Sequence, residues 1–210
     1  MLIDDASDLF YALQKLNLIA DKPPFWWPKY GTFEVVVGAI LTQNTQWSKV
    51  EKSLDNLRNN NLISLEGLAH CDRDILQEHI KVSGLYKTKA KYLQLLAQSI
   101  LETFGDFETF FYEVNRDYLL DQKGVGFESA DAILSYACKR EEVLVVDAYS
   151  ARLLEALGFE FEAYHEIQSW LSSGVKAENG NYAIFHGMIV AYCKANSKGK
   201  KVMIEALNFK

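Results

Sequence analysis

The sequence predicts an all-α protein, and two kinds of signal support this prediction. Apolar residues recur three and four positions apart along most of the chain, as is typical of helices that bury one face. Glycines follow several of these segments and capping residues precede others, so helix ends are marked on both sides. The glycines are Gly84, Gly105, Gly158 and Gly174, and the N-cap candidates are Thr32, Asp72 and Asp147.

The helical pattern can be followed from the N-terminus onward. It is carried by Leu9, Leu13 and Leu16, by Val50, Leu54 and Leu57, by Leu93, Leu96 and Ile100, and by Ile133, Leu134 and Ala137. The segments from Glu34 to Leu41 and from Val143 to Val146 are rich in β-branched residues that also suit strands. The first is long enough for a buried helix. The second is short and fits an extended lead into the helix that Asp147 would cap.

The composition limits the class of protein. A chain of 210 residues with 49% hydrophobic residues can bury the core of one or two domains. No signal peptide or membrane-spanning run is recognisable, so we expect a soluble, cytoplasmic protein. Cys71, Cys138 and Cys193 lie far apart, which favours reduced thiols over disulfides. The net charge of −6 weighs against a protein that coats nucleic acid, although lysines cluster locally at 87–91 and 194–201.

An aromatic loop stands out near the N-terminus. All three prolines fall at positions 23, 24 and 28, around Phe25, Trp26 and Trp27. Proline fixes its own backbone angle and lacks the N–H that a helix interior needs. We therefore expect a rigid, non-helical loop here and the first candidate boundary between domains.

The run Lys123-Gly124-Val125-Gly126 places two glycines around one apolar residue, between a short helix and a longer one. Glycines allow close backbone approach, so such a turn can present N–H groups to a phosphate, helped by the N-terminus of the next helix. Val125 would anchor the turn in the core. Any tight connection between helices can use glycines, so this run alone does not establish DNA binding.

A second feature follows the hairpin, where the run Val143-Leu144-Val145-Val146 ends in Asp147, with Arg152 five residues later. Together the hairpin and the aspartate resemble the helix-hairpin-helix DNA glycosylases of the endonuclease III type. The resemblance extends over most of the chain through the segments 39–46, 84–90 and Phe185-His186-Gly187. It departs at Gln122 and Lys123, where the family usually has Leu and Pro.

This resemblance implies two helical domains with the active site in the cleft between them. Residues 31–143 would form one domain, carrying the helix-hairpin-helix at about 116–139, and residues 1–30 with 144–210 would form the other. The implied partner is double-stranded DNA that contains an alkylated base, and we expect a monomer. The residues expected to contact DNA at the hairpin are Lys123, Gly124, Val125, Gly126 and Ser129.

An aspartate at the start of a helix is commonly just an N-cap. Capping and the helix dipole favour the ionised carboxylate, which is the form that stabilises an oxocarbenium-like sugar or directs water onto it. The resemblance implies this catalytic role for Asp147. Family members that also nick the strand carry a lysine nucleophile where this chain has Glu128. A carboxylate cannot form an imine, so we expect a monofunctional glycosylase that uses water.

Most endonuclease III-like proteins hold a [4Fe–4S] cluster with four C-terminal cysteines. The matching places here are Ala191, Lys198, Lys201 and Leu207. Cys193 alone cannot hold a cluster, so we expect no cofactor and no metal. The lysine-rich tail at 197–201 would contact the DNA backbone directly.

The identity of the base follows from the pocket that a flipped nucleotide needs. The candidate pocket residues are Trp26, Trp27 and Trp47, with Glu34 or Glu128 as carboxylates. Aromatic walls stack on a base, and a cationic base adds cation–π attraction. The cluster-free bacterial branch of the family points to 3-methyladenine, which carries such a charge.

Gln43 or Asn44 would be the wedge that fills the gap left in the duplex. Within the family, mismatch adenine glycosylases place a catalytic Glu where this chain has Ala39, which weakens that alternative. A glycosylase for another damaged or mismatched base stays open. Two other classes of protein also stay open. One is a helix-hairpin-helix module that binds DNA without catalysis, which is compatible with the acidic net charge and with Gln122 and Lys123 before the turn. The other is a helical protein that does not bind nucleic acid.

Overall fold

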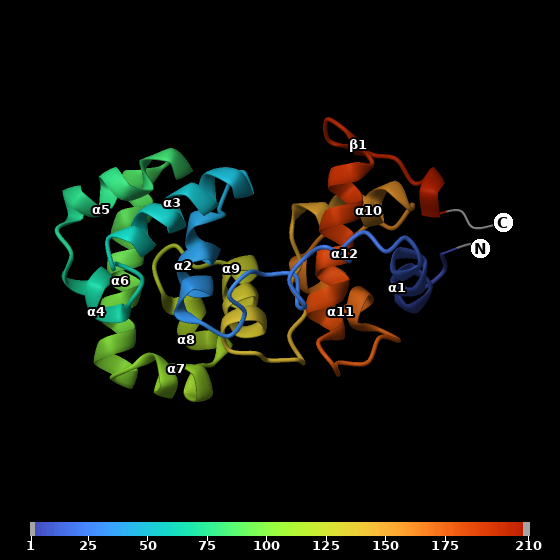
Figure 1. The fold of residues 1–210 in the computed structure, drawn as a ribbon. Coiled ribbons are helices and arrows are strands. Elements are labelled where there is room, and N and C mark those ends of the chain that lie inside the picture. The colour runs from blue at the N-terminus through green and yellow to red at the C-terminus, as the bar shows by residue number, and fades with distance from the viewer. Residues whose placement is uncertain (1–2, 208–210) are drawn as a thin grey trace. The chain divides into compact units, whose positions relative to one another are not determined.

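The computed structural model describes residues 3–207 and confirms the all-α prediction apart from one short pair of strands (Figure 1). The chain divides into two compact units, which we describe separately. The hairpin unit is Lys29–Lys139, and the aspartate unit combines the residues up to Pro28 with those from Arg140 onward. The expected limits were 31 and 143. Residues 29–31 belong to the hairpin unit because the Gly31 N–H donates to the Tyr136 carbonyl at 2.8 Å.

The hairpin unit is a cluster of helices, most of them short. Its elements are α2 (Phe33–Leu41), α3 (Trp47–Asn59), α4 (Leu65–His70), α5 (Arg73–Ile80), the 3₁₀ turn η1 (Lys81–Ser83), α6 (Tyr86–Phe104), α7 (Phe107–Glu113), α8 (Arg116–Asp121), α9 (Phe127–Ala132) and the π-helical segment η2 (Ile133–Ala137). The long α6 contacts α4 and α5, which precede it in the sequence, and α7, which follows it.

The core of this unit is α2. Eight of its nine residues are buried, and it contacts α3, α6, α9 and η2. The ambiguous segment from Glu34 to Leu41 is therefore a helix. A helix that is buried on nearly all sides has no polar face, so its sequence lacks the amphipathic period that would have distinguished it from a strand.

The helix-hairpin-helix consists of α8, the turn at 122–126, and α9 continuing into η2, which agrees with the expected short and longer helices. A bidentate pair holds the two helices together: Arg116 donates to Asp131 through Nε at 2.7 Å and Nη2 at 3.0 Å. The Asp131 side chain is only 1% exposed. This pair ties α8 to α9, and removing one partner would leave a buried charge uncompensated.

The aspartate unit is built from α1 (Ala6–Lys15), α10 (Ala148–Ala156), α11 (Tyr164–Ser172) and α12 (Asn181–Ala195). Figure 1 shows α12 passing beside α10, and α12 also packs against α1. The core between them includes Leu9, Leu13, Leu153, Phe185 and Ile189. Residues 143–146 are neither helix nor strand, so they form the extended lead into α10 that the sequence predicted.

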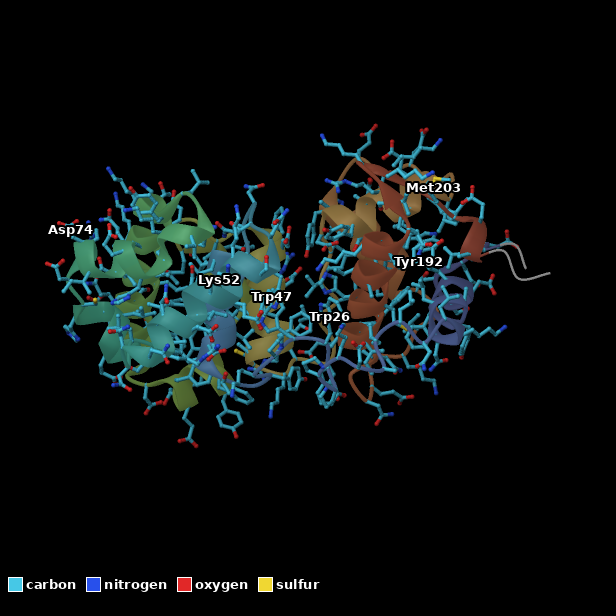
Figure 2. The ribbon with its side chains drawn as sticks, turned by 45° about the horizontal axis from the view of Figure 1, so that its top comes forward. Trp26, Trp47, Lys52, Asp74, Tyr192 and Met203 are labelled. Carbon is cyan, nitrogen blue, oxygen red and sulfur yellow. The ribbon has the colours of Figure 1, made fainter. Side chains whose placement is uncertain are left out.

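The C-terminal end of this unit departs from the helical pattern. Strands β1 (Ser197–Lys198) and β2 (Lys201–Val202) pair antiparallel, with Ser197 opposite Val202, and a 3₁₀ turn, η3 (Glu205–Leu207), follows. Figure 2 shows Tyr192 of α12 near Met203, and the Tyr192 hydroxyl donates to the Met203 carbonyl at 2.8 Å. These bonds fold the tail back onto α12.

Helix ends follow the sequence signals with one exception. The side chains of Asp72 and Asp147 accept the capping bonds expected of them, and Gly84, Gly105, Gly158 and Gly174 all have positive φ. Thr32 occupies the N-cap position of α2 but makes no capping bond. Its hydroxyl donates instead to the Lys29 carbonyl at 2.7 Å, which closes the preceding turn. Within residues 3–207 no helix is both long and apolar enough to span a bilayer.

Candidate functional site

The Asp147 carboxylate is the N-cap of α10 and is surrounded by donors. Its Oδ1 atom accepts from the backbone N–H groups of Tyr149 and Ser150, both at 2.9 Å, and from the Ser150 hydroxyl at 3.2 Å. Ser150 also completes a capping box with the Asp147 backbone. One carboxylate oxygen is therefore fully engaged by the first turn of its own helix.

The second oxygen faces another helix. Asp147 Oδ2 lies 3.4 Å from Nε2 of His186 on α12, and the two side chains are only 13% and 6% exposed. This distance exceeds the roughly 2.9 Å of an ordinary N–H···O bond, so the contact is close but not tight. Burial tends to raise the pKa of the Asp147 carboxyl, but the nearby His186 imidazole, together with the Ser150 donors, lowers the pKa below its ordinary value. The site therefore holds a buried, ionised carboxylate.

The aromatic loop belongs to the same unit as Asp147. Trp26 has a left-handed backbone (φ 69°) and lies against Gly187 of α12, where an added Cβ would come within 2.7 Å of the Trp26 side chain. A glycine at 187 is thus what allows the indole to approach the helix. Trp27 is half-buried in the same loop.

Lys194 joins this group of side chains. Its ammonium lies 5.8 Å from the centroid of the Trp26 ring and 5.9 Å from that of Tyr149. Burial lowers the pKa of Lys194, while the nearby Asp147 carboxylate opposes that effect. One helix, α12, therefore supplies the partner of the carboxylate, the glycine that Trp26 packs against and a cation near the Trp26 ring.

The hairpin turn is built as the sequence predicted. Gly124 has φ 87°, and an added Cβ would collide with the Tyr92 ring. Val125 is buried at 7% exposure, while Gly126 is the N-cap of α9 and has open space around it. Lys123 is exposed at the start of the turn. The first N–H groups of α9 therefore follow an exposed, basic turn, which is the arrangement that suits a phosphate.

The two wedge candidates have different surroundings. Gln43 Nε2 donates to the Gly124 carbonyl at 2.8 Å and to the Ser129 hydroxyl at 2.9 Å, so its amide braces the hairpin. Ser129 itself is 6% exposed. Asn44 is exposed and has a left-handed backbone (φ 51°). Asn44 therefore projects from the segment that Gln43 anchors.

Lys89 supports the segment that carries Gln43 and Asn44. The sequence placed it in a basic cluster and in the segment 84–90 but assigned it no structural role. Lys89 is 2% exposed, and its ammonium donates to the Leu41 carbonyl at 2.8 Å, the Thr45 hydroxyl at 2.7 Å and the Ser83 carbonyl at 2.9 Å. Burial lowers its pKa to about 8. In a helical segment rich in lysine, the sequence alone does not distinguish a buried lysine from an exposed one. The role of Lys89 follows only from its three acceptors.

The other predicted pocket residues lie in the hairpin unit. Trp47 is half-buried at the first position of α3, and Glu128 is exposed in the first turn of α9. Glu34 is engaged at 2.6 Å by Arg58, which removes it from the set of available carboxylates.

A model of the HhH-GPD superfamily of base excision DNA repair proteins matches residues 37–176, which include both the hairpin and Asp147. The chain belongs to the HhH-GPD superfamily. It is 37% identical over 198 residues to a protein of Methanocaldococcus jannaschii provisionally described as a DNA repair glycosylase, covering 91% of this chain and 90% of that protein. The chain is accordingly a member of a family of base excision repair DNA glycosylases.

Solved structures of HhH-GPD proteins share its fold. The 3-methyladenine DNA glycosylase MagIII of Helicobacter pylori, bound to 1,N6-ethenoadenine, is 42% identical with a TM-score of 0.88, covering 92% of this chain and 99% of that one. A non-covalent endonuclease III–DNA complex aligns with a TM-score of 0.77 at 20% identity, covering 94% of this chain and 90% of that one. The second likeness concerns the fold alone.

The residues at the cluster position of HhH-GPD relatives do not fit an iron–sulfur cluster. Ala191, Lys198, Lys201 and Leu207 stand at the four ligand places, and none offers a thiolate. Cys193 is buried, and its thiol donates to the Tyr149 carbonyl at 3.6 Å. Burial raises the pKa of Cys193 to about 12, opposite to the shift a metal-binding thiolate needs.

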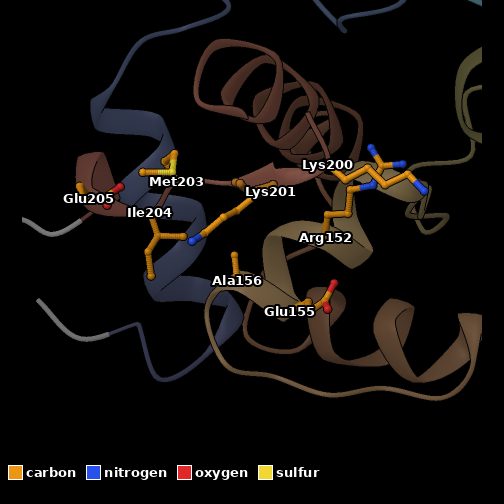
Figure 3. A pocket seen from close by; sticks show the side chains of 9 residues that line it. Arg152, Glu155, Ala156, Lys200, Lys201, Met203, Ile204 and Glu205 are labelled. Atoms are coloured by element: carbon orange, nitrogen blue, oxygen red, sulfur yellow. The ribbon is translucent and has the colours of Figure 1, made fainter. Parts of the chain in front are cut away.

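A surface pocket lies between α10 and the hairpin of β1 and β2 in this HhH-GPD chain (Figure 3). Arg152 and Lys200 line it together, and their side chains extend to the same end in Figure 3, while Glu155 and Glu205 also contribute to its lining.

Proposed function

We propose that this protein is a monofunctional DNA glycosylase that releases 3-methyladenine and related alkylated bases by hydrolysis of the N-glycosidic bond. The observation that carries the proposal is the Asp147 carboxylate, which is buried, ionised and surrounded by donors beside an aromatic loop. The 42% identity to a 3-methyladenine DNA glycosylase supports the choice of base.

The proposed reaction uses the negative charge of Asp147. As the bond between the sugar C1′ and the base nitrogen breaks, its electron pair leaves with the base, and positive charge develops on the sugar. A fixed, poorly solvated carboxylate stabilises that charge strongly. Water then adds to C1′ and loses a proton to the carboxylate or to solvent, which leaves an abasic site. A base that is already cationic, such as 3-methyladenine, departs as a neutral molecule.

Base recognition is proposed to rest on Trp26, Trp27 and Trp47. The Lys194 ammonium lies 5.8 Å from the centroid of the Trp26 ring, so we propose that a flipped base stacks on the tryptophans beside this cation. Stacking contributes about 1–3 kcal/mol per base, which offsets the few kcal/mol needed to flip the nucleotide.

DNA is proposed to bind through the hairpin turn, with Asn44 as the wedge and Gln43 as its brace. Glu128 occupies the place of the lysine nucleophile, so no Schiff base forms and no strand is nicked. We propose further that the enzyme acts as a monomer without an iron–sulfur cluster and that the lysines of the β1–β2 hairpin contact phosphates.

The proposal is tested by incubating the protein with methylated duplex DNA and separating the released bases by chromatography. We expect 3-methyladenine as the main product. Release by wild type but not by the Asp147→Asn variant would support the assignment, whereas DNA binding without base release by wild type would leave only a binding module. Borohydride treatment during turnover should trap no covalent adduct, and an adduct would contradict the water mechanism.

A further inference from the structure

We propose that His186 is a positioning residue for base release, whose imidazole holds Oδ2 of Asp147 in the orientation that the reaction uses. This inference rests on the proposed function, because it requires that Asp147 is the catalytic carboxylate. It concerns a contact between two helices that the capping role of Asp147 does not explain.

The two oxygens of Asp147 have partners of different origin. The three donors to Oδ1 come from Tyr149 and Ser150, so any aspartate that caps α10 would acquire them. The partner of Oδ2 comes from α12, 39 positions beyond Asp147 in the sequence. A cap is stable without such a partner. The His186 contact therefore gives the second oxygen a partner from outside its own helix.

The position of His186 is itself fixed by packing. Its side chain is 6% exposed, and its neighbours Phe185 and Gly187 are engaged on either side: Phe185 lies in the core, while Gly187 lies against Trp26. A shift of α12 would thus move the aromatic loop and the imidazole together. The same turn of α12 therefore contacts both Trp26, which is proposed to stack on the base, and Asp147, which is proposed to act on the sugar.

Electrostatics give His186 a second effect. The titratable and charged groups around Asp147 are His186, Cys193 and Lys194 on α12 and Tyr149 and Arg152 on α10. Burial raises the pKa of Asp147, and the largest opposing contribution comes from the His186 imidazole 3.4 Å from Oδ2. Without the imidazole the effect of burial on the Asp147 pKa is opposed less strongly. The pKa of Asp147 then rises, and the carboxylate is protonated at a higher pH.

The test compares two substitutions of similar size. Leu at 186 fills the space without a donor, while Gln keeps an N–H near the former Nε2. Single-turnover rates of 3-methyladenine release are measured across the acidic pH range. We expect His186→Leu to lower the plateau rate by about ten- to hundredfold, because small displacements of a reacting group have effects of this order, and to move the acid limb of the profile to higher pH.

The conservative variant decides between positioning and mere packing. His186→Gln should recover most of the rate and of the acid limb, and both variants should bind duplex DNA containing an abasic-site analogue within about twofold of wild type. Equal losses in the Gln and Leu variants that follow their melting temperatures, or wild-type rates and pH profiles in both, would overturn the inference.

A comparison of wild type with Asp147→Asn covers the case in which the His186→Leu variant does not fold. With ¹⁵N-labelled imidazoles, Asp147→Asn should shift the Nε2 resonance of His186 while the exposed His70 and His165 keep theirs; an unmoved resonance would contradict the contact. The same variant separates the two proposals. Full base release by Asp147→Asn would refute the proposed catalytic carboxylate, whereas an inactive Asp147→Asn beside a fully active His186→Leu would refute this inference alone.

Discussion

The hairpin turn and the Asp147 site differ in how their parts are distributed along the chain. The turn is a continuous run of four residues, 123–126, whose backbone geometry is set by its own glycines. The Asp147 site gathers the loop around Trp26, the first turn of α10 and the face of α12 that carries His186 and Lys194. A continuous motif can be recognised in a sequence. A site assembled from three separate segments is recognised only from the contacts in the structure.

Each region also buries a charged group whose role differs from that of the other. The aspartate unit keeps a buried anion beside an imidazole, while the hairpin unit buries the Lys89 ammonium among carbonyl and hydroxyl oxygens. The buried anion can act on a positive charge that develops in a substrate. The buried cation has all its donors directed inward, so its role is to hold the segment that precedes α3.

Among the structural predictions the largest effect is expected at the turn. Gly124→Ala places a side chain at φ 87° against Tyr92, which should lower the free energy of unfolding by at least about 2 kcal/mol and weaken DNA binding more than tenfold. Gly126→Ala is the matched control for stability alone, because Gly126 also belongs to the turn proposed to contact DNA; φ there is −102° and nothing lies within 4 Å of the added methyl. Thermal unfolding and DNA titration measure both. Similar losses of stability in the two variants would show that the Gly124 geometry is not the cause.

Lys89→Met should lower the free energy of unfolding by about 2–4 kcal/mol, because the Leu41 and Ser83 carbonyls lose a charged donor. Lys91→Met, an exposed position on the same helix, should change it by less than about 0.5 kcal/mol. Urea unfolding compares the variants. Equal stability of the Lys89 variant and wild type would mean that the ammonium does not support segment 42–45.

The pH dependence of stability offers an independent check on Lys89. Its folded pKa of about 8 lies below the ordinary 10.5, so between these values the unfolded chain binds more protons than the folded one. The contribution of this group to the free energy of unfolding therefore rises with pH through that window. The difference in unfolding free energy between wild type and Lys89→Met should grow from pH 8 to pH 10. A flat difference would contradict the lowered pKa.

A smaller effect is expected at the brace of the hairpin. Gln43→Ala removes the donor to Gly124 and Ser129 and should lower the free energy of unfolding by about 1–2 kcal/mol. Asn44→Gly keeps the left-handed backbone at φ 51° and should leave stability nearly unchanged while weakening binding to lesion DNA. Calorimetry and DNA titration separate the two roles. The reverse pattern would make Gln43 the wedge and Asn44 the structural residue.

The sequence predicted the parts of this molecule that depend on local rules. The capping of α10 by Asp147, the turn at 123–126 and the non-helical loop around Trp26 all follow from residues within a few positions of one another. Long-range partners were not predictable in this way. Neither the contact of His186 with Asp147 nor the bond from Gln43 to Gly124 has a periodic or compositional signal, because each joins segments at least 39 positions apart.

Two further features were missed for different physical reasons. The strands at 197–202 are too short and too rich in lysine to show strand alternation, and bonds to α12 hold them in place. Thr32 has the residue type of an N-cap, but its hydroxyl is used by the turn before α2. In both cases a tertiary or neighbouring contact outweighs the local preference.

The account depends most directly on Asp147 as the group that enables base release. The decisive measurement is single-turnover release of 3-methyladenine from methylated duplex DNA by wild type and by Asp147→Asn, with DNA affinity measured in parallel. Loss of the charge should slow release on the order of a thousandfold or more, while affinity stays within a few-fold. Release by the Asn variant at a rate near that of wild type would contradict the account.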